Sequence, residues 1–100
     1  MSMLGRVLSD LYCNDGKPTM VTLSIIRNTY GENSGAWAIL RFLEEKGFVR
    51  RELDGGKIRV YLTPHGKMAL SRDLRDLDEE LRKRVREARR CMRRKKRYLI

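Results

Sequence analysis

The sequence predicts a mainly α-helical fold with one small β-hairpin and a long helix at its C-terminal end. Three observations support this prediction. Apolar residues recur at helical spacing in the first half of the chain. The run Asp-Gly-Gly at positions 54–56 separates two strand-like segments, which is typical of a tight hairpin turn. After Pro64 the chain has no further proline and one more glycine, so a helix of roughly thirty residues is expected there.

The first helix is predicted from an i, i+3, i+4, i+7 stripe of apolar residues: Leu4, Val7, Leu8 and Leu11. Turn-forming residues at positions 14–18 end this helix. A second, shorter helix is expected to follow with Thr19 or Thr22 as its N-cap, although β-branched residues lower its helix propensity.

A third helix is predicted between an N-cap at Asn33 or Ser34 and a stop at Gly47. This helix is apolar almost all round, and Arg41 is the basic side chain in its middle. Such a helix usually buries most of its surface. Packing of Trp37 against the C-terminal helix or a second subunit is therefore favoured over its exposure to a ligand.

The hairpin is expected to consist of strands Phe48–Leu53 and Lys57–Leu62. Side chains alternate between the two faces of a strand, so Arg50 and Arg51 are expected to point to opposite sides. By the same alternation, the apolar residues of the second strand share one face. They are Ile58, Val60 and Leu62.

The last third of the chain is predicted to be one continuous helix that begins at Thr63-Pro64, because a capping threonine followed by proline is typical of a helix start. The chain therefore divides into a first part at 1–63 and a helical part at 64–100. One apolar seam follows this helix at spacings of three and four residues, close to a heptad repeat. Its residues are Leu70, Leu74, Leu77, Leu81, Val85, Ala88 and Met92.

This seam predicts that the helix packs against a second copy of the chain. Acidic residues dominate the first half of the helix, and Lys and Arg dominate the second half. An antiparallel pair would place each acidic half beside the basic half of its partner, so an antiparallel coiled-coil homodimer is favoured over a parallel one. The alternative is a helix that folds back on its own domain and buries the seam without a partner.

The charge of the chain indicates a polyanionic partner. Its 23 Lys and Arg outnumber its 13 Asp and Glu, which gives a formal net charge of +10. Nucleic acid is the most common partner for such an excess, followed by an acidic membrane surface and an acidic protein. No apolar stretch approaches the roughly 18 residues of a membrane span, and the first residues do not form a signal peptide. We therefore expect an intracellular, cytoplasmic protein without a membrane-spanning segment.

Enzymatic and metal sites have little support in the sequence. Cys13 and Cys91 are far apart, and with the single His65 they do not make up a four-ligand zinc site. The chain also lacks a glycine-rich phosphate loop and a nucleophile with an adjacent base. We therefore expect no catalytic activity, no metal and no cofactor.

Two segments of the chain resemble winged-helix proteins. Residues 40–51, LRFLEEKGFVRR, resemble the end of the recognition helix and the first wing strand of bacterial and archaeal winged-helix regulators. Residues 61–67, YLTPHGK, resemble the strand-to-helix junction of the MarR and PadR groups. A small archaeal winged-helix chromatin family, with one long helix after the wing, is similar in size and layout. The resemblance implies a winged helix-turn-helix DNA-binding domain at 1–63 followed by a dimerisation helix.

The resemblance also implies where DNA would be bound. The candidates on the helix that meets DNA in the family are Asn33, Ser34, Trp37 and Arg41. For the first two, plain helix capping is an equal alternative. Stronger candidates for phosphate contacts lie on the hairpin, with a merely solvated basic hairpin as the alternative. They are Arg50, Arg51, Lys57 and Arg59. Beyond the seam, Arg93 and Arg94 either follow the DNA backbone or belong to a basic tail.

These observations together predict a double-stranded DNA-binding protein, a dimeric transcriptional regulator associated with the nucleoid. Because the third helix is apolar, recognition of DNA backbone and shape is favoured over direct reading of bases. Two alternatives stay open. One is an architectural chromatin protein of low sequence specificity, and the other is a basic interaction module for RNA or an acidic partner.

Overall fold

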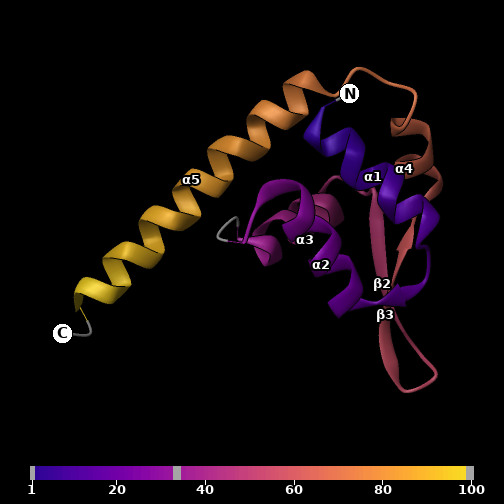
Figure 1. Cartoon of the computed structure of the whole chain (residues 1–100), viewed down its shortest axis with the longest axis horizontal. Helices are drawn as coiled ribbons and strands as arrows, with labels where there is room; N and C mark the ends of the chain where they lie inside the picture. Colours follow the sequence, from indigo (N-terminus) through magenta and orange to yellow (C-terminus); the bar gives the residue numbers. More distant parts are fainter. Residues whose placement is uncertain (1, 33–34, 99–100) are drawn as a thin grey trace.

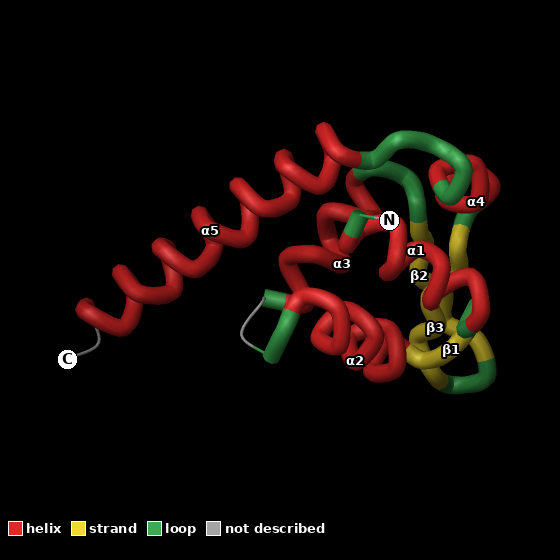
Figure 2. The backbone as a smooth tube through the Cα atoms, turned by 45° about the horizontal axis from the view of Figure 1, so that its top comes forward, coloured by secondary structure: helices red, strands yellow, loops and turns green. Residues whose placement is uncertain are grey.

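Helices and a small sheet form the body of the molecule, and one long helix leaves it (Figures 1 and 2). The computed structural model describes residues 2–32 and 35–98, with side chains as far as residue 91. The elements in chain order are α1 (Met3–Cys13), β1 (Lys17–Pro18), α2 (Thr19–Tyr30), α3 (Ala36–Glu45), β2 (Val49–Asp54), β3 (Lys57–Leu62), α4 (Pro64–Ala69) and α5 (Arg75–Tyr98). α2 contacts both α1 and α3, and each of these helices contacts the sheet.

The described strands form an antiparallel sheet in the order β1-β3-β2. β2 and β3 pair along their whole length, so that Leu53 lies opposite Ile58 near the turn. The turn residues Gly55 and Gly56 have φ angles of 62° and 79°, a region that favours glycine. The predicted hairpin is confirmed: its second strand has the expected bounds, and its first strand is shifted by one residue. β1, which is two residues long, was not predicted.

The core lies between the helices and one face of the sheet. The predicted apolar stripe of α1 is buried, with no member more than 3% exposed. α3 contributes further side chains that are 0% exposed: Ile39, Leu40, Phe42 and Leu43. Burial of each side chain of this size stabilises the fold by about 1.5–3 kcal/mol. One side of α3 is therefore firmly attached to the body.

α3 begins later than the sequence predicted. Its N-cap is Gly35, which has a left-handed backbone with φ 72° and ψ 56°. The prediction of Asn33 or Ser34 as the N-cap is therefore wrong, and both residues lie outside the described part of the chain. Glycine has no Cβ, so it can make this turn at little steric cost. The turn brings Ala36 directly into the core, where it is 6% exposed.

The predicted continuous C-terminal helix is interrupted, because α4 ends at Ala69 and α5 begins at Arg75. α4 approaches the start of β2 very closely: a Cβ added to Gly66 would lie 2.2 Å from the carbonyl oxygen of Phe48. The residues between the helices let the chain turn from this contact toward α1 and α3. At the new helix start, the carboxylate of Asp73 accepts a hydrogen bond of 3.1 Å from the backbone N–H of Arg75.

The first half of α5 packs against its own domain. Leu74 and Leu81 belong to the core, with exposed fractions of 5% and 0%. Leu70, Leu77 and Val85 are partly buried against the same core. The second half of α5 extends away from the body (Figure 1). The first half of the seam is therefore buried within its own domain, as the alternative to the coiled coil predicted.

Polar contacts join α5 to the body as well. The hydroxyl of Tyr30 on α2 donates a hydrogen bond of 2.9 Å to Oδ1 of the buried Asp78. Burial and this hydrogen bond raise the pKa of Tyr30, so its hydroxyl stays protonated and a donor into the alkaline range. Nζ of Lys46 lies 3.0 Å from Oε1 of Glu80. These contacts fix the direction in which α5 leaves the body.

Replacing Leu81 by alanine should lower the free energy of unfolding by about 2–5 kcal/mol, because a cavity would form where α5 meets the core. Chemical denaturation followed by circular dichroism measures this change. Met68→Ala is the matched control, since Met68 is 56% exposed and its truncation should cost about 1 kcal/mol or less. Equal effects of the two substitutions would show that α5 is not docked in this way.

Candidate nucleic-acid interface

α3 has one buried side and one exposed side. Trp37 is 49% exposed, and Arg41, four residues later on the same side, is exposed as well. Trp37 is therefore not packed against the C-terminal helix of its own chain, and its packing against a second subunit stays a prediction. α5 covers the Phe42 side of α3, where the guanidinium of Arg84 lies 5.4 Å from the centre of the Phe42 ring. The Trp37 side of the helix is left open.

Arg51 links the wing, the hairpin formed by β2 and β3, to the exposed side of α3. Its guanidinium carbon lies 5.9 Å from the centre of the Trp37 ring, a cation–π contact. Its Nε lies 2.8 Å from Oε1 of Glu44 near the end of α3. A cation, an aromatic ring and a carboxylate from two elements therefore meet at the base of the wing.

Arg50 lies on the opposite face of the wing, as the alternation predicted. Its guanidinium carbon lies 4.8 Å from the centre of the Tyr61 ring, and it forms an ion pair with Glu52. The Tyr61 hydroxyl donates a hydrogen bond of 3.0 Å to Oδ2 of Asp54. This hydrogen bond raises the pKa of Tyr61. The outer face of the wing thus carries its own network of paired charges.

Arg59 connects the wing to the body. Its Nη1 donates a hydrogen bond of 3.0 Å to the carbonyl oxygen of Gly16, between α1 and β1. Its Nε lies 3.4 Å from the carbonyl oxygen of Asp54 near the turn. The hydroxyl of Thr19 donates a further hydrogen bond of 3.1 Å to the carbonyl oxygen of Ile58. Arg59, a predicted phosphate contact, therefore has a positioning role within the chain.

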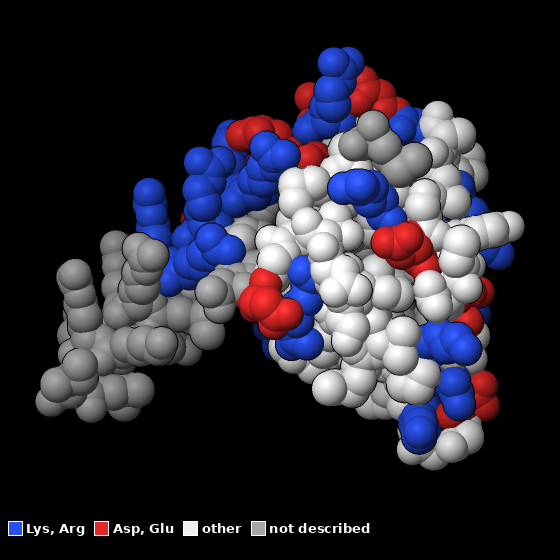
Figure 3. Space-filling model, in the orientation of Figure 1, with Lys and Arg blue, Asp and Glu red and all other residues white. Residues whose placement is uncertain are grey.

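A groove of about 1190 Å³ lies between the start of α3 and the later part of α5. Trp37 and Arg41 line it from α3, and Arg84 and Arg89 line it from α5. Figure 3 shows Lys and Arg side chains along α5 and around the wing, with a largely uncharged surface between them. The basic charge visible on this face is therefore divided between two regions.

The structure brings only some of the predicted residues together. Trp37 contacts Arg51 and shares the groove with Arg41. Lys57 is exposed at the turn, opposite Asp54. The remaining predicted positions lie outside the described side chains: Asn33, Ser34, Arg93 and Arg94.

Exposed apolar side chains near the wing were not among the predicted site residues. Leu53, Ile58 and Met20 are 76%, 50% and 68% exposed. The strand alternation correctly assigned Ile58 to the face of Val60, but it could not show that the hairpin extends past the helices that cover that face. The exposure of Ile58 depends on how far the strands extend beyond the helices, and that is known only once the chain is folded.

Two kinds of site receive no support from the described residues. Within residues 2–32 and 35–91, no group of three or more His, Cys, Asp or Glu side chains is placed to hold a metal ion. None of the described helices is long and apolar enough to cross a membrane.

Comparison with known proteins identifies the fold. No protein-family model matches this chain, and no curated protein matches it. The crystal structure of SSV1 F-93 is similar over 94% of this chain and 93% of that chain, with 22% sequence identity and a TM-score of 0.56. Together with the order of helices and hairpin, this likeness shows that the chain has a winged-helix fold followed by a C-terminal helix.

Arg59→Ala should loosen the wing without unfolding the body, because it removes the hydrogen bonds of Arg59 to the backbone carbonyls of Gly16 in the body and Asp54 near the turn. We expect amide hydrogen exchange in β2 and β3 to accelerate about tenfold while exchange in α1 stays unchanged. Arg50→Ala is the control, since the contacts of Arg50 stay within the wing. Similar exchange in both variants would contradict the positioning role of Arg59.

Proposed function

We propose that this chain binds double-stranded DNA as a homodimer and acts as a transcriptional regulator, in the cytoplasm and associated with the nucleoid. The observation that carries the proposal is the exposed side of α3, where Trp37 and Arg41 lie beside Arg51 of the wing. An α-helix fits the major groove of B-DNA, and an adjacent hairpin can reach the flanking backbone. Arg51 joins the two elements here through its contacts with Trp37 and Glu44.

The charge of the chain supports a polyanionic ligand. At +10, the free protein repels itself and gains from the release of counterions when it binds DNA. The Arg51–Glu44 ion pair does not prevent a phosphate contact, because about a third of each side chain is exposed. The exposed part of the Arg51 side chain is open to a DNA phosphate, which would compete with the carboxylate of Glu44 for the guanidinium.

The homodimer is proposed through the later part of α5. Leu74 and Leu81 are buried in their own chain, so they are not offered to a partner. Val85 and Ala88 are partly buried, and the side chain of Met92 lies outside the described residues. This part of the seam continues on the half of α5 that extends from the body, where a second copy can cover it.

An antiparallel arrangement is our proposal for this dimer. The charge argument for it is weaker than the sequence alone implied, because acidic residues of α5 have partners within the chain. Asp78 accepts the Tyr30 hydrogen bond, and Glu80 pairs with Lys46. These contacts reduce the charge that remains for the basic half of a partner helix.

An architectural role with low sequence specificity is the second candidate. The composition of α3 favours this role. On its described exposed side, Arg41 offers hydrogen-bond donors and Trp37 offers an aromatic surface, which are few groups for reading bases. Selection of bound duplexes from a random pool distinguishes the two roles. A recovered motif supports a regulator, and the absence of a motif supports an architectural protein.

The double variant Arg51→Ala/Lys57→Ala should bind duplex DNA more weakly and with a smaller salt dependence. If both cations contact phosphates, the slope of log affinity against log salt should fall by about 1.8, at about 0.9 per contact. Gel-shift titrations at several salt concentrations measure the slope.

Lys67→Ala/Arg72→Ala is the matched control, because it removes the same charge from exposed positions outside α3 and the wing. An equal loss of slope in both variants would remove the wing from the proposal. Failure of the unmodified protein to bind duplex DNA at low salt would overturn the proposed function and favour RNA or an acidic protein as the partner.

Ala88→Glu should convert the dimer into a monomer, because it places a charge in the seam on the extended half of α5. Sedimentation equilibrium at micromolar concentration measures the change. Arg90→Gln also lowers the net charge by one but alters an exposed position, so it should leave the dimer intact. A monomeric unmodified protein would contradict the homodimer.

A further inference from the structure

The wing carries an apolar pair that is exposed to solvent. Leu53 is 76% exposed and Ile58 is 50% exposed. They lie opposite each other in the β2–β3 register, next to the glycine turn. Burial of a Leu or Ile side chain is worth about 1.5–3 kcal/mol, so a pair left in water is a surface that gains from being covered.

This pair continues the core-facing side of the sheet beyond the body. Val49, Leu62 and Val60 occupy the same face and are buried under the helices. The turn end of the hairpin extends past the helices as a narrow two-stranded ribbon (Figure 1). The apolar side of the ribbon therefore becomes a solvent-exposed tip at Leu53 and Ile58.

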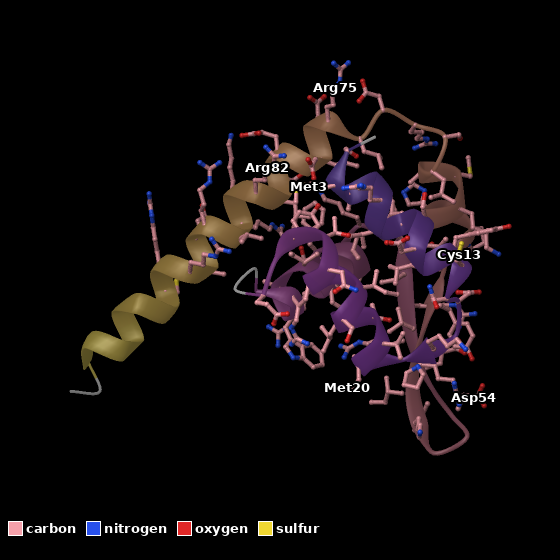
Figure 4. All side chains as sticks on the ribbon, in the orientation of Figure 1. Met3, Cys13, Met20, Asp54, Arg75 and Arg82 are labelled. Carbon is pink, nitrogen blue, oxygen red and sulfur yellow. The ribbon has the colours of Figure 1, made fainter. Side chains whose placement is uncertain are left out.

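The tip is held in place before any ligand binds. Arg59 joins the ribbon to Gly16 and to the backbone of Asp54, and Thr19 hydrogen-bonds to the carbonyl oxygen of Ile58. Met20, the next residue, is 68% exposed and lies at the end of the molecule that carries the wing (Figure 4). A rigid ribbon loses little conformational entropy on binding, which favours contacts made through its tip.

The charges around the pair indicate which ligand fits it. Arg51 shares the face of Leu53 and Ile58, whereas Lys57, next to Ile58 in the sequence, pairs with Asp54 on the opposite face of the ribbon. The acidic side chains of the ribbon lie on the opposite face. There Asp54 accepts the Tyr61 hydrogen bond and Glu52 pairs with Arg50. An apolar tip with Arg51 on its own face and no carboxylate of the ribbon beside it complements the minor groove of a duplex, which has sugar walls and phosphate edges.

We propose that Leu53 and Ile58 enter the DNA minor groove beside the segment bound by α3, partly separate adjacent base pairs and bend the duplex. This inference rests on the proposed DNA-binding function. Apolar side chains that wedge into the minor groove bend DNA in this way, and the bend brings more of the duplex against the protein. The wing then contributes shape recognition, because steps that unstack easily are bent at lower cost.

The test is the double variant Leu53→Ser/Ile58→Ser, assayed on a short duplex with donor and acceptor dyes at its ends. The unmodified protein should shorten the dye-to-dye distance and raise the fluorescence of 2-aminopurine placed at the flanking step. The variant should lose both signals and bind about tenfold more weakly. Arg51 and Lys57 are unchanged in this variant, so the loss of both signals reports on the apolar pair.

Two further variants complete the experiment. Tyr12→Ser/Met68→Ser removes two side chains that are 55% and 56% exposed on α1 and α4, and it should bend DNA like the unmodified protein. Leu53→Met/Ile58→Met keeps an apolar tip and should retain the bend. Thermal unfolding verifies that each variant is folded.

The outcomes separate this inference from the function on which it rests. An unmodified protein that does not bind duplex DNA overturns the proposed function. An unmodified protein that binds duplex DNA without bending it, or a Ser variant that bends it equally, overturns the wedge alone. Binding of duplex DNA without bending would assign the apolar tip to a protein partner.

Discussion

Two candidate surfaces, the exposed side of α3 and the later part of α5, depend on the burial of Leu81 where α5 meets α1 and α3. It covers the Phe42 side of α3 and leaves the Trp37 side open. It also sets the direction of α5, whose later half leaves the body at a defined angle (Figure 1). In a dimer formed through α5, the separation of the two α3 helices would follow from this one packing contact. Dimer geometry and the spacing of DNA half-sites are then coupled.

The net charge of the chain overstates the charge that is free to meet a ligand. Arg51 is paired with Glu44, Arg50 is paired with Glu52, and Arg59 is hydrogen-bonded to backbone carbonyls. Each of these cations holds part of the wing in position. A wing held in position by these contacts is suited to recognise the shape of a ligand. The positive charge that is not paired within the chain attracts the ligand.

Much of the fold was predictable because its elements are marked by local patterns. The stripe from Leu4 to Leu11 predicted α1, and the glycine turn predicted the hairpin. The break at Ala69 was not predicted, because the apolar seam continues across it at helical spacing, although Asp73, which accepts from the backbone N–H of Arg75, is of a type that favours helix starts. The helix is interrupted there by the close contact of Gly66 with Phe48 and by the docking of α5, and both contacts join residues from different elements.

For the candidate site, the sequence by itself determined which residues share a face. Alternation separated Arg50 from Arg51, and the family resemblance placed Trp37 and Arg41 together on the helix that meets DNA. Only the tertiary structure decided which of these faces are covered. It left Trp37 exposed, enclosed the first half of the α5 seam, and carried Leu53 beyond the body. The physical reason is that periodicity is a property of a single helix or strand, whereas burial depends on which neighbouring elements reach each face and how far they extend.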